Sequence, residues 1–596
     1  MNRRSFLRTL GLGTAALTLS SVAGLAREPE AGLSTGASAE AENLKPDEVS
    51  GAGRPNVLLI LADDMGFSDA GCYGGDIRTP NLDALAANGV RFTQHYSTGR
   101  CWPSRACILT GYYAQHIRRD GAPGIGMGKR PTWARLLPDL LKPLGYHSYH
   151  SGKWHIDGDP MDNGFERSWG GERSGCDWNR FFSSGIWEED GVKAPGGRTD
   201  EGYYSTVAIA DHAIQCLKLH KKHHGNPSTG SGQGAPFFSY VAFYSPHFPL
   251  HALRKDIATY RDTYQEGWDV MRKRRWERMK KMGIINCPLS ERDEKIIPSW
   301  NFTPEQLKTQ IGQGEAPFAV AWDTLTDEQK KFQATKMAIH AAMITRMDME
   351  IGRIVQQLKN MGAYENTLIL FASDNGASAE QIIRGDKHDK SAPLGSAKTF
   401  LCLGPGWSTV ANAPLRLHKH WNHEGGISSP LIAHWPKRIP DKGELRHDPT
   451  HFIDIPPTIM ELAGGSWPRI RNGITTPPTP GKSLLPAFAS NGAVQHESLW
   501  WCHKGNQAIR MGDWKLTMRV GSKKWELYNV KVDRSEMNDL SAKYPDKTMM
   551  LADKWQTILD GFIKDLAVSP VPAFSVRAAQ VRAGSKAVGN GKEIKG

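Results

Sequence analysis

Three stretches of the chain are continuous apolar runs that each end in polar residues able to do chemistry. They are "NVLLILADD" (56–64), "PFFSYVAFYSPH" (236–247) and "NTLILFASDNG" (366–376). Unbroken apolar runs of this length are typical of strands buried on both faces, as in a parallel sheet covered by helices. "PLIAHWP" (430–436) predicts one more strand. We therefore expect functional side chains to gather at the carboxyl ends of buried strands.

Helical segments lie between these strands. Residues 79–89 predict a short helix, and residues 336–362 predict a long one with apolar side chains at helical spacing. Strands that alternate with helices indicate an α/β fold with a large, mostly parallel mixed sheet flanked by helices. The basic run 271–281, "MRKRRWERMKK", is interpreted as the solvated face of a helix.

The last part of the chain changes character. Residues 505–530 predict three short strands with a hairpin turn at Gly512-Asp513, and a helix is expected near 546–563. This pattern indicates a small α+β subdomain with an antiparallel sheet. The predicted organisation is a signal peptide, a flexible linker, a catalytic domain, this C-terminal subdomain and a disordered basic tail, at 1–26, 27–53, 54–489, 490–575 and 576–596.

The beginning of the chain is typical of an export signal. "RRSFLRTLG" places Arg3 and Arg4 before a weakly apolar stretch that is too short and too rich in Gly, Ser and Thr for a stable membrane span. This pattern predicts a bacterial protein carried by the twin-arginine export machinery to the periplasm or outside the cell. The net charge of +12 belongs partly to the two ends, and the mild excess of the body is a poor signal for nucleic acid.

Oxygen-bearing side chains follow two of the predicted strands. Asp63 and Asp64 end one strand, and Asp374 and Asn375 end another. Carboxylate and amide oxygens are ligands of hard cations, and the eight cysteines show no zinc-type spacing. An Asn-Gly pair is also common in turns. Because both groups follow buried strands, the sequence predicts a Ca²⁺ site, with Mg²⁺ as second choice.

Several cationic side chains accompany this predicted metal site. "GKWH" supplies Lys153 and His155, "SPHFPLH" supplies His247, "RLHKHW" supplies Lys419, and Arg105 lies near Cys101. Each of these residues alone is most often an ordinary polar residue. Together with a cation site they form a set that can hold a tetrahedral oxyanion and transfer it.

Cys101 stands in "GRCWPSRACILTG" (99–111), close to Cys107. Pro103 suits the first turn of a helix, so Cys101 is expected just before that helix, near its free N–H groups. A cysteine is a possible nucleophile there. Thiolates are nevertheless poor ligands for Ca²⁺ or Mg²⁺, so an oxygen at this position would serve the site better.

"CWPSR" resembles the Cys-x-Pro-Ser-Arg motif of the type I sulfatases, the formylglycine-dependent, arylsulfatase-like family of the alkaline phosphatase superfamily. "NVLLILADD", "ILTG", "GKWH", "SPHFPL", "SDNG" and "HKHWNHEGGI" are similar to the other motifs of that family, over roughly residues 54–575. Arg100 and Trp102 flank the cysteine where small or aliphatic residues are more usual. The resemblance implies an alkaline-phosphatase-like sandwich.

The resemblance also implies a mechanism. A formylglycine-generating enzyme oxidises Cys101 to formylglycine (3-oxoalanine), whose hydrate binds the metal together with the residues Asp63, Asp64, Asp374 and Asn375. One hydroxyl attacks sulfur, the alcohol leaves with a proton from His247 or Lys419, and a formylglycine–sulfate intermediate remains. His155 then takes the proton of the second hydroxyl, and sulfate is expelled. Arg105 and Lys153 hold the formylglycine, and substrate binding falls to Lys153, His247 and Lys419.

The implied substrate is a sulfated small molecule or glycan. Five tryptophans near the motifs could stack on sugar faces, which would favour a sulfated carbohydrate, or could equally belong to the core: Trp154, Trp407, Trp421, Trp500 and Trp501. Aryl sulfates remain possible. Two other functions compete with a sulfatase. One is a phosphoester or phosphonate ester hydrolase on the same fold, and the other is an exported protein that binds sulfated glycans without catalysis.

Overall fold

The structure, a computed structural model, describes most of the chain. The described residues are 53–171, 181–182, 187–193, 202–225, 234–384, 388–440, 442–471 and 474–569, and they belong to one compact unit. The predictions of a signal peptide, of a linker and of a basic tail lie outside the described residues, apart from residue 53. The domain boundary near residue 490 stays a prediction.

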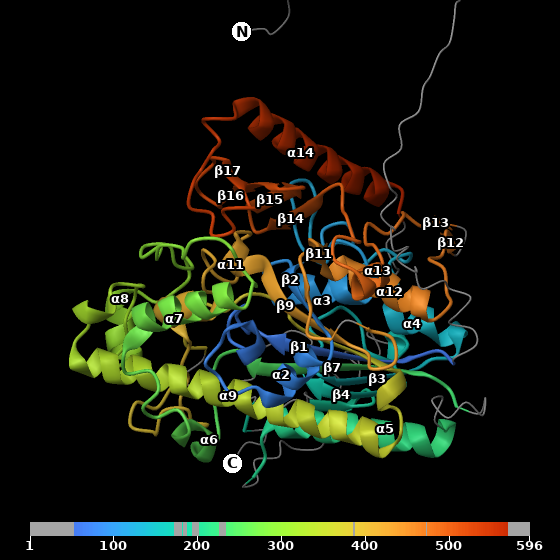
Figure 1. Ribbon diagram of the computed structural model, residues 1–596, viewed down its shortest axis with the longest axis horizontal. Helices are drawn as coiled ribbons and strands as arrows, with labels where there is room; N and C mark the ends of the chain where they lie inside the picture. Colours follow the sequence, from blue (N-terminus) through green and yellow to red (C-terminus); the bar gives the residue numbers. More distant parts are fainter. Residues whose placement is uncertain are drawn as a thin grey trace, which may run out of the picture. The chain divides into compact units, whose positions relative to one another are not determined.

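The predicted large sheet is confirmed as an 11-stranded mixed sheet (Figure 1). Its central strands β8, β1, β7, β3 and β4 are parallel, whereas β9 and the outer strand β5 pair antiparallel with their neighbours. In spatial order the strands are β10 (Leu445–Arg446), β2 (Val90–Tyr96), β9 (Ser428–His434), β8 (Thr367–Ser373), β1 (Asn56–Asp63), β7 (Phe237–Pro246), β3 (His147–Gly152), β4 (Arg167–Gly171), β5 (Trp187–Glu189) and β6 (Val192–Lys193), and β11 (Thr450–His451) also pairs with β2.

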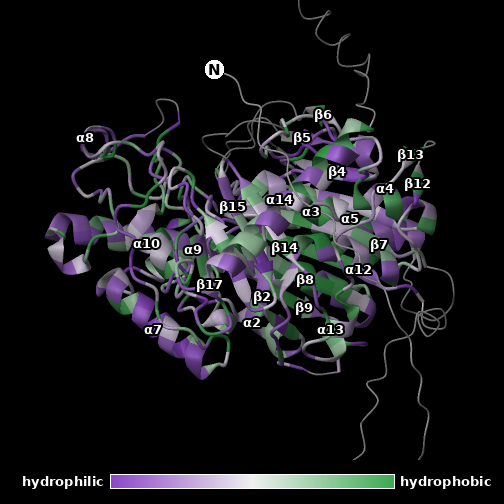
Figure 2. Ribbon diagram, turned by 90° about the horizontal axis from the view of Figure 1, so that it is seen from above, coloured by the Kyte–Doolittle hydropathy of each residue, from purple (hydrophilic) through white to green (hydrophobic). Residues whose placement is uncertain are grey.

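Strand β1 shows why the sheet forms here. Alternate side chains of a strand point to opposite faces, and every residue of β1 is buried. Leu58, Ile60 and Ala62 pack into one apolar core, while Val57, Leu59 and Leu61 pack into a second core on the other face. The strands around β7, β8 and β9 are accordingly coloured largely hydrophobic in Figure 2.

Helices cover both faces of this sheet, so each core is closed. In Figure 1, α9 and α5 lie below the central strands, and α3, α12 and α14 lie above them. The first core is lined by α2 (Pro80–Ala87), α5 (Ser205–His224), α7 (Gly267–Lys281), α9 (Asp327–Asn360) and α10 (Gly404–Ala411). The second is lined by α3 (Cys101–Thr110), α4 (Leu137–Leu141), α12 (Ile455–Leu462), α13 (Leu485–Ala489) and α14 (Pro545–Ala567). Shorter helices are α6 (Arg254–Ala258), α8 (Pro304–Gln306) and α11 (Glu424–Ile427).

The three strands predicted within residues 505–530 are confirmed, and a preceding strand joins them in a separate four-stranded antiparallel sheet. They are β14 (Leu499–His503), β15 (Asn506–Met511), β16 (Trp514–Met518) and β17 (Glu526–Asn529). Gly512 and Asp513 connect β15 to β16, as expected. A two-stranded sheet of β12 (Ile470–Arg471) and β13 (Ile474–Thr475) lies between α12 and α13 in the chain.

The basic run in α7 corrects one expectation. The helix is largely hydrophilic (Figure 2), but Arg275 is fully buried and forms ion pairs of 2.7 Å with both Asp69 and Asp76. Arg272 is buried as well and donates to the Ser290 carbonyl. The run is therefore a solvated face only in part, because two of its arginines anchor α7 to the body. Among the described residues, no helix has the length and apolar character needed to cross a membrane.

Candidate active site

The site lies at the carboxyl ends of three adjacent parallel strands. The register pairs Ala62 of β1 with Ser373 of β8, and Asp63 with Pro246 of β7. The residues that follow these strands therefore emerge at one edge of the sheet. The structure thus brings together Asp63, Asp64, His247, Asp374 and Asn375, which lie far apart in the sequence.

The oxygen-bearing side chains form a tight cluster. The amide nitrogen of Asn375 donates to Asp64 Oδ1 at 2.7 Å, and the backbone N–H of Asp64 donates to Asp374 Oδ1 at 3.3 Å. Among the described residues, the buried atoms Asp63 Oδ1 and Asn375 Oδ1 have no hydrogen-bond partner. Asp64 has a left-handed backbone (φ 64°), which is strained for a non-glycine residue and is often found at functional sites. This donor set suits a hard divalent cation, which would satisfy the two oxygens.

Three buried cationic side chains face these carboxylates. Lys153 Nζ lies 2.5 Å from Asp63 Oδ2, and Lys419 Nζ lies 2.6 Å from Asp64 Oδ1. Arg105 donates to Asp374 Oδ2 from both Nε and Nη2, at 3.0 and 2.8 Å, and to the Lys153 carbonyl at 3.0 Å. The side chains of Arg105, Lys153 and Lys419 are buried, so water screens these pairs only weakly.

The three carboxyl groups differ in the direction of their pKa shifts. Burial alone would raise the pKa of Asp63, but Lys153, His247, Arg105 and Lys419 outweigh it and hold that pKa well below its usual range. Burial raises the pKa of Asp64 and Asp374, and the negative charge of Asp63 raises both further. Burial therefore disfavours the ionised forms of Asp64 and Asp374, and a bound cation would favour them.

Cys101 is the first residue of α3, not the residue before the helix as expected. Its sulfur and one carboxylate oxygen from each of Asp63 and Asp374 all lie within 4.8 Å of one another. The preceding residue does not cap the helix with its side chain, so N–H groups at this end remain available. Cys107, two turns further on, is different: it packs in the second core, and burial raises the pKa of its thiol.

The two predicted histidines lie on different sides of the cluster. His247 places Nε2 3.6 Å from Asp64 Oδ2, and its Nδ1 donates to the Phe248 carbonyl at 2.6 Å. The ring of His155 lies 5.7 Å from the ring of Trp102, beside the start of α3. His155 also has a left-handed backbone (φ 55°), a second strained position in this region.

A rim of residues beside Cys101 was not predicted. Glu380 forms a buried ion pair with Arg100 at 3.4 Å, lies 3.8 Å from Lys419, and accepts a hydrogen bond from Trp300 at 2.9 Å. Arg100 lies 5.3 Å from the Trp102 ring centre, and Lys504 lies 5.2 Å from the Trp300 ring centre. Glu380 follows "SDNG" closely, which was an available signal, but Trp300 and Lys504 come from segments without a motif.

The five tryptophans that were left open between a sugar-stacking and a core position are buried. Each has at most 4% of its surface exposed: Trp154, Trp407, Trp421, Trp500 and Trp501. Trp407, for example, packs edge-on against Trp268 and Trp322 in the first core. These five side chains therefore help to form the cores on which the site rests. The tryptophans beside Cys101 that are partly exposed are Trp102 and Trp300.

Comparisons with known proteins show the family of this chain. The family model described as "Sulfatase" matches residues 55–466. An uncharacterized sulfatase of Schizosaccharomyces pombe is 32% identical over 549 residues, covering 84% of this chain and 93% of that protein. An arylsulfatase of Klebsiella aerogenes is 30% identical over 440 residues, covering 69% and 87%. The crystal structure of Ps i-CgsB in complex with k-i-k-neocarrahexaose has a TM-score of 0.57 at 23% identity, covering 89% and 98%.

The chain belongs to the sulfatase family of the alkaline phosphatase superfamily. The predicted fold class and enzyme class are confirmed: it is a sulfuric ester hydrolase with an alkaline-phosphatase-like architecture. A metal ion fits the family, and the two unpartnered oxygens of Asp63 and Asn375 fit such an ion in this chain.

Proposed function

We propose that the protein hydrolyses sulfate monoesters with a formylglycine derived from Cys101. The observation that carries this proposal is the position of the Cys101 sulfur, which is grouped with the oxygens of Asp63 and Asp374 in a buried site. A thiol is a poor partner for a hard cation, whereas the oxygen of an oxidised side chain suits it. The free N–H groups at the start of α3 favour an anion at the same place.

Ca²⁺ is the proposed metal, with Mg²⁺ as second choice. The residues that would hold it are Asp63, Asp64, Asp374, Asn375 and the oxidised residue 101. All are oxygen donors, and Ca²⁺ accepts six to eight oxygens in flexible geometry. The two unpartnered buried oxygens of Asp63 and Asn375 support this assignment.

The formylglycine hydrate would supply the nucleophilic hydroxyl that attacks sulfur. Arg105 and Lys153, buried at the start of α3 and at the end of β3, would hold that side chain. Lys419 and His247, both beside Asp64, would bind the sulfate oxygens and protonate the departing alcohol. His155 would take the proton that releases the sulfate. Arg105, Lys153, Lys419 and His247 are all buried, so few water molecules would compete with them for the substrate.

The proposed substrate is a sulfated carbohydrate, with aryl sulfates as the other possibility. The rim supports this choice, because Trp102 and Trp300 flank Arg100 and Lys504. Aromatic rings suit sugar faces, and cationic side chains suit the negative charges of a sulfated glycan. The arylsulfatase relative supports the alternative.

Relative rates on matched esters test the proposed function. The sulfate and phosphate monoesters of one alcohol, such as 4-nitrophenol, are compared by kcat/KM, followed by a panel of sulfated sugars. We expect the sulfate ester to be preferred and at least one sulfated sugar to be turned over. A preference for the phosphate ester would favour the rival phosphoester or phosphonate ester hydrolase. Binding of sulfated glycans without any turnover would favour the non-catalytic alternative.

We further propose that the protein acts in the periplasm or outside a bacterial cell after export by the twin-arginine machinery. The support is Arg3 and Arg4 before a short, weakly apolar segment. Because this route carries folded proteins, a formylglycine-generating enzyme would have to modify Cys101 before export.

A further inference from the structure

A second group of side chains of the types that bind metals lies at the amino-terminal ends of β3 and β4. The proposed active site lies at the opposite, carboxyl ends of the strands. His147 begins β3, Glu166 immediately precedes β4, and His224 ends α5. Lys153 follows the other end of β3, so the two places are separated by the length of that strand, roughly 16 Å for six residues. None of the three residues belongs to the proposed sulfatase machinery.

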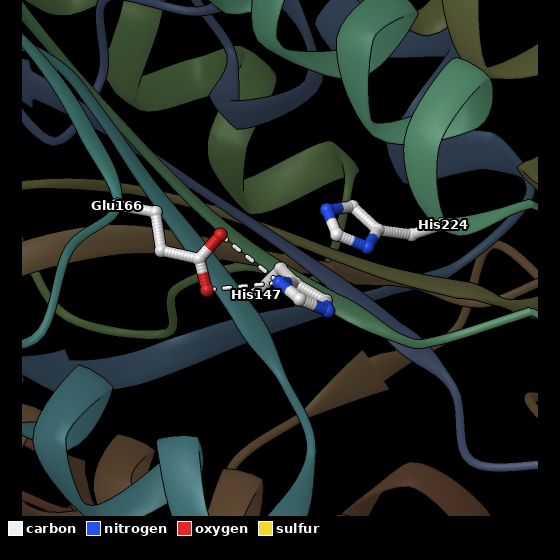
Figure 3. A group of neighbouring side chains, drawn as sticks. All are labelled: His147, Glu166 and His224. Carbon is white, nitrogen blue, oxygen red and sulfur yellow. Dashed lines mark hydrogen bonds and ion pairs between the residues drawn. The ribbon is translucent and has the colours of Figure 1, made fainter.

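The three side chains converge, as Figure 3 shows. His147 Nδ1 lies 2.8 and 2.9 Å from the two carboxylate oxygens of Glu166. The rings of His147 and His224 are stacked, with centres 3.6 Å apart and planes tilted by 23°. One ligand atom from each residue can be chosen so that all three lie within 4.8 Å of one another.

The neighbours of this group are occupied with other contacts. His220, one turn earlier on α5, has Nδ1 3.0 Å from the Tyr149 hydroxyl and Nε2 2.9 Å from the Ala235 carbonyl. Arg167, next to Glu166, pairs with Glu189 and Asp190. Glu166 is therefore not neutralised by the adjacent arginine, and His220 cannot offer a ring nitrogen to an ion without losing a hydrogen bond.

His224 is the informative member. No hydrogen bond to its ring nitrogens is formed by any residue that the structure describes. An ordinary His147–Glu166 ion pair needs no second imidazole stacked on it.

We propose that His147, Glu166 and His224 form a binding site for a borderline divalent cation such as Zn²⁺. Two imidazoles and one carboxylate are typical zinc ligands, and water can take the fourth position because the side chains of His147 and Glu166 are 24% and 36% exposed. Donor atoms around a tetrahedral zinc ion lie roughly 3.4 Å apart for bonds of about 2.1 Å. Because the two rings are stacked, binding would turn them out of this arrangement so that one nitrogen of each points at the ion.

The ion would connect three elements that are distant in the sequence. It would link the C-terminal end of α5 to the amino-terminal ends of β3 and β4, next to the start of β7. A bound ion would thereby stabilise this end of the strands without contact to the substrate. The proposal does not depend on the sulfatase function and can fail or succeed independently of it.

The test is zinc binding by equilibrium dialysis of the purified full-length protein, with Ca²⁺ in excess to occupy the active site. His224→Ala is the test variant, and His223→Ala is the matched control one residue earlier on the same helix. We expect the wild type and His223→Ala to hold one more zinc per chain than His224→Ala, with sulfatase activity unchanged in all three. Equal zinc contents in the wild type and His224→Ala would overturn the proposal, as would an equal loss in His223→Ala.

Crystals soaked in zinc provide the second measurement, which does not depend on the variants. The account predicts an anomalous-scattering peak between the two imidazoles and the Glu166 carboxylate. Anomalous density at the active site or elsewhere, with none at this group, would contradict it.

Discussion

At the scale of single residues, the site is defined by three carboxylates that are buried together. Lys153 pairs with Asp63, Lys419 with Asp64, and Arg105 with Asp374. Burial raises the pKa of Asp64 and Asp374, and Asp63 Oδ1 and Asn375 Oδ1 have no hydrogen-bond partner among the described residues. The proposed Ca²⁺ would favour the ionised carboxylates and give both oxygens a partner.

Asp374→Ala is therefore expected to abolish metal binding. The variant removes one ligand and also the partner of Arg105, so activity should fall by at least about 100-fold. Elemental analysis of the purified protein measures bound calcium and magnesium, and Asp513→Ala, in the exposed turn after β15, is the control. Circular dichroism shows whether each variant is folded. Full activity in Asp374→Ala, or stoichiometric zinc without calcium or magnesium in the wild-type active site, would contradict the metal assignment.

At the scale of elements, α7 is attached to the body through buried charges. Arg275 reaches Asp69 and Asp76, which precede α2 in the chain. Removal of one partner from such a group leaves the other charges buried and unpaired. Loss of Arg275 should therefore be costly in free energy, although the sequence of α7 is that of a solvent-exposed helix.

Arg275→Met should destabilise the protein by about 4 kcal/mol, because Asp69 and Asp76 lose their common partner. The matched control is Arg274→Met, whose arginine pairs with Glu266 on the surface with about half of its side chain exposed. That change should leave the free energy of unfolding nearly unchanged, because the pair is exposed to water. Urea unfolding followed by tryptophan fluorescence measures both variants, and equal losses of stability would refute the proposed role of Arg275.

The same cluster predicts acid sensitivity. Burial alone would raise the pKa of Asp69, but His340 and Arg275 outweigh it and lower that pKa from 3.8 to about 2. A carboxyl whose pKa is lower in the folded state stabilises the protein above its unfolded pKa, and this contribution is lost as the pH falls towards the folded value. About 2 kcal/mol should disappear between about pH 4 and pH 2. Unfolding curves of Asp69→Asn should lack this part of the pH dependence, and an unchanged slope would count against it.

The sequence predicted those parts of the fold that depend on local patterns. Apolar runs located β1, β7, β8 and β9, and the polar residues after three of them marked the site. The burial of Arg275 could not be predicted, because its partner Asp76 lies 199 positions away and is brought near by packing. Trp300 and Lys504 were missed for the same reason. For the tryptophans close to the motifs, the sequence left a sugar-facing and a core position open, since proximity in sequence does not determine whether a ring faces the site or the core.

At the scale of the whole molecule, the C-terminal sheet is joined to the large sheet by buried charges. Lys515 of β16 pairs with Glu424 of α11 at 2.9 Å and with Glu536 at 2.8 Å in a fully buried position. The site combines segments as distant as residues 63 and 419, so under the proposed twin-arginine route it would form before export.

Replacement of Arg3 and Arg4 by lysine should trap the precursor in the cytoplasm, because the twin-arginine pair is the recognition feature of the proposed route. Cell fractionation with immunoblotting measures the distribution, and replacement of Arg8 by lysine serves as the control. Unchanged export of the Arg3→Lys, Arg4→Lys variant would mean that another route carries the protein.

The central claim concerns Cys101, and variants separate it from the nearby Cys107. Cys101→Ser should lose turnover while it folds normally, because serine lacks the second hydroxyl that a formylglycine hydrate offers. Cys107→Ala should keep its activity and lose about 1 kcal/mol of stability, since it only empties a small volume in the core. Activity assays and thermal unfolding of both variants check this contrast.

The most direct measurement is mass spectrometry of the tryptic peptide 101–105 from active enzyme. The account predicts that residue 101 has lost its sulfur and gained an aldehyde oxygen, and that the modified fraction of different preparations tracks their specific activity. Full activity in a preparation whose Cys101 is entirely an unmodified thiol would contradict it and would make the cysteine itself the nucleophile.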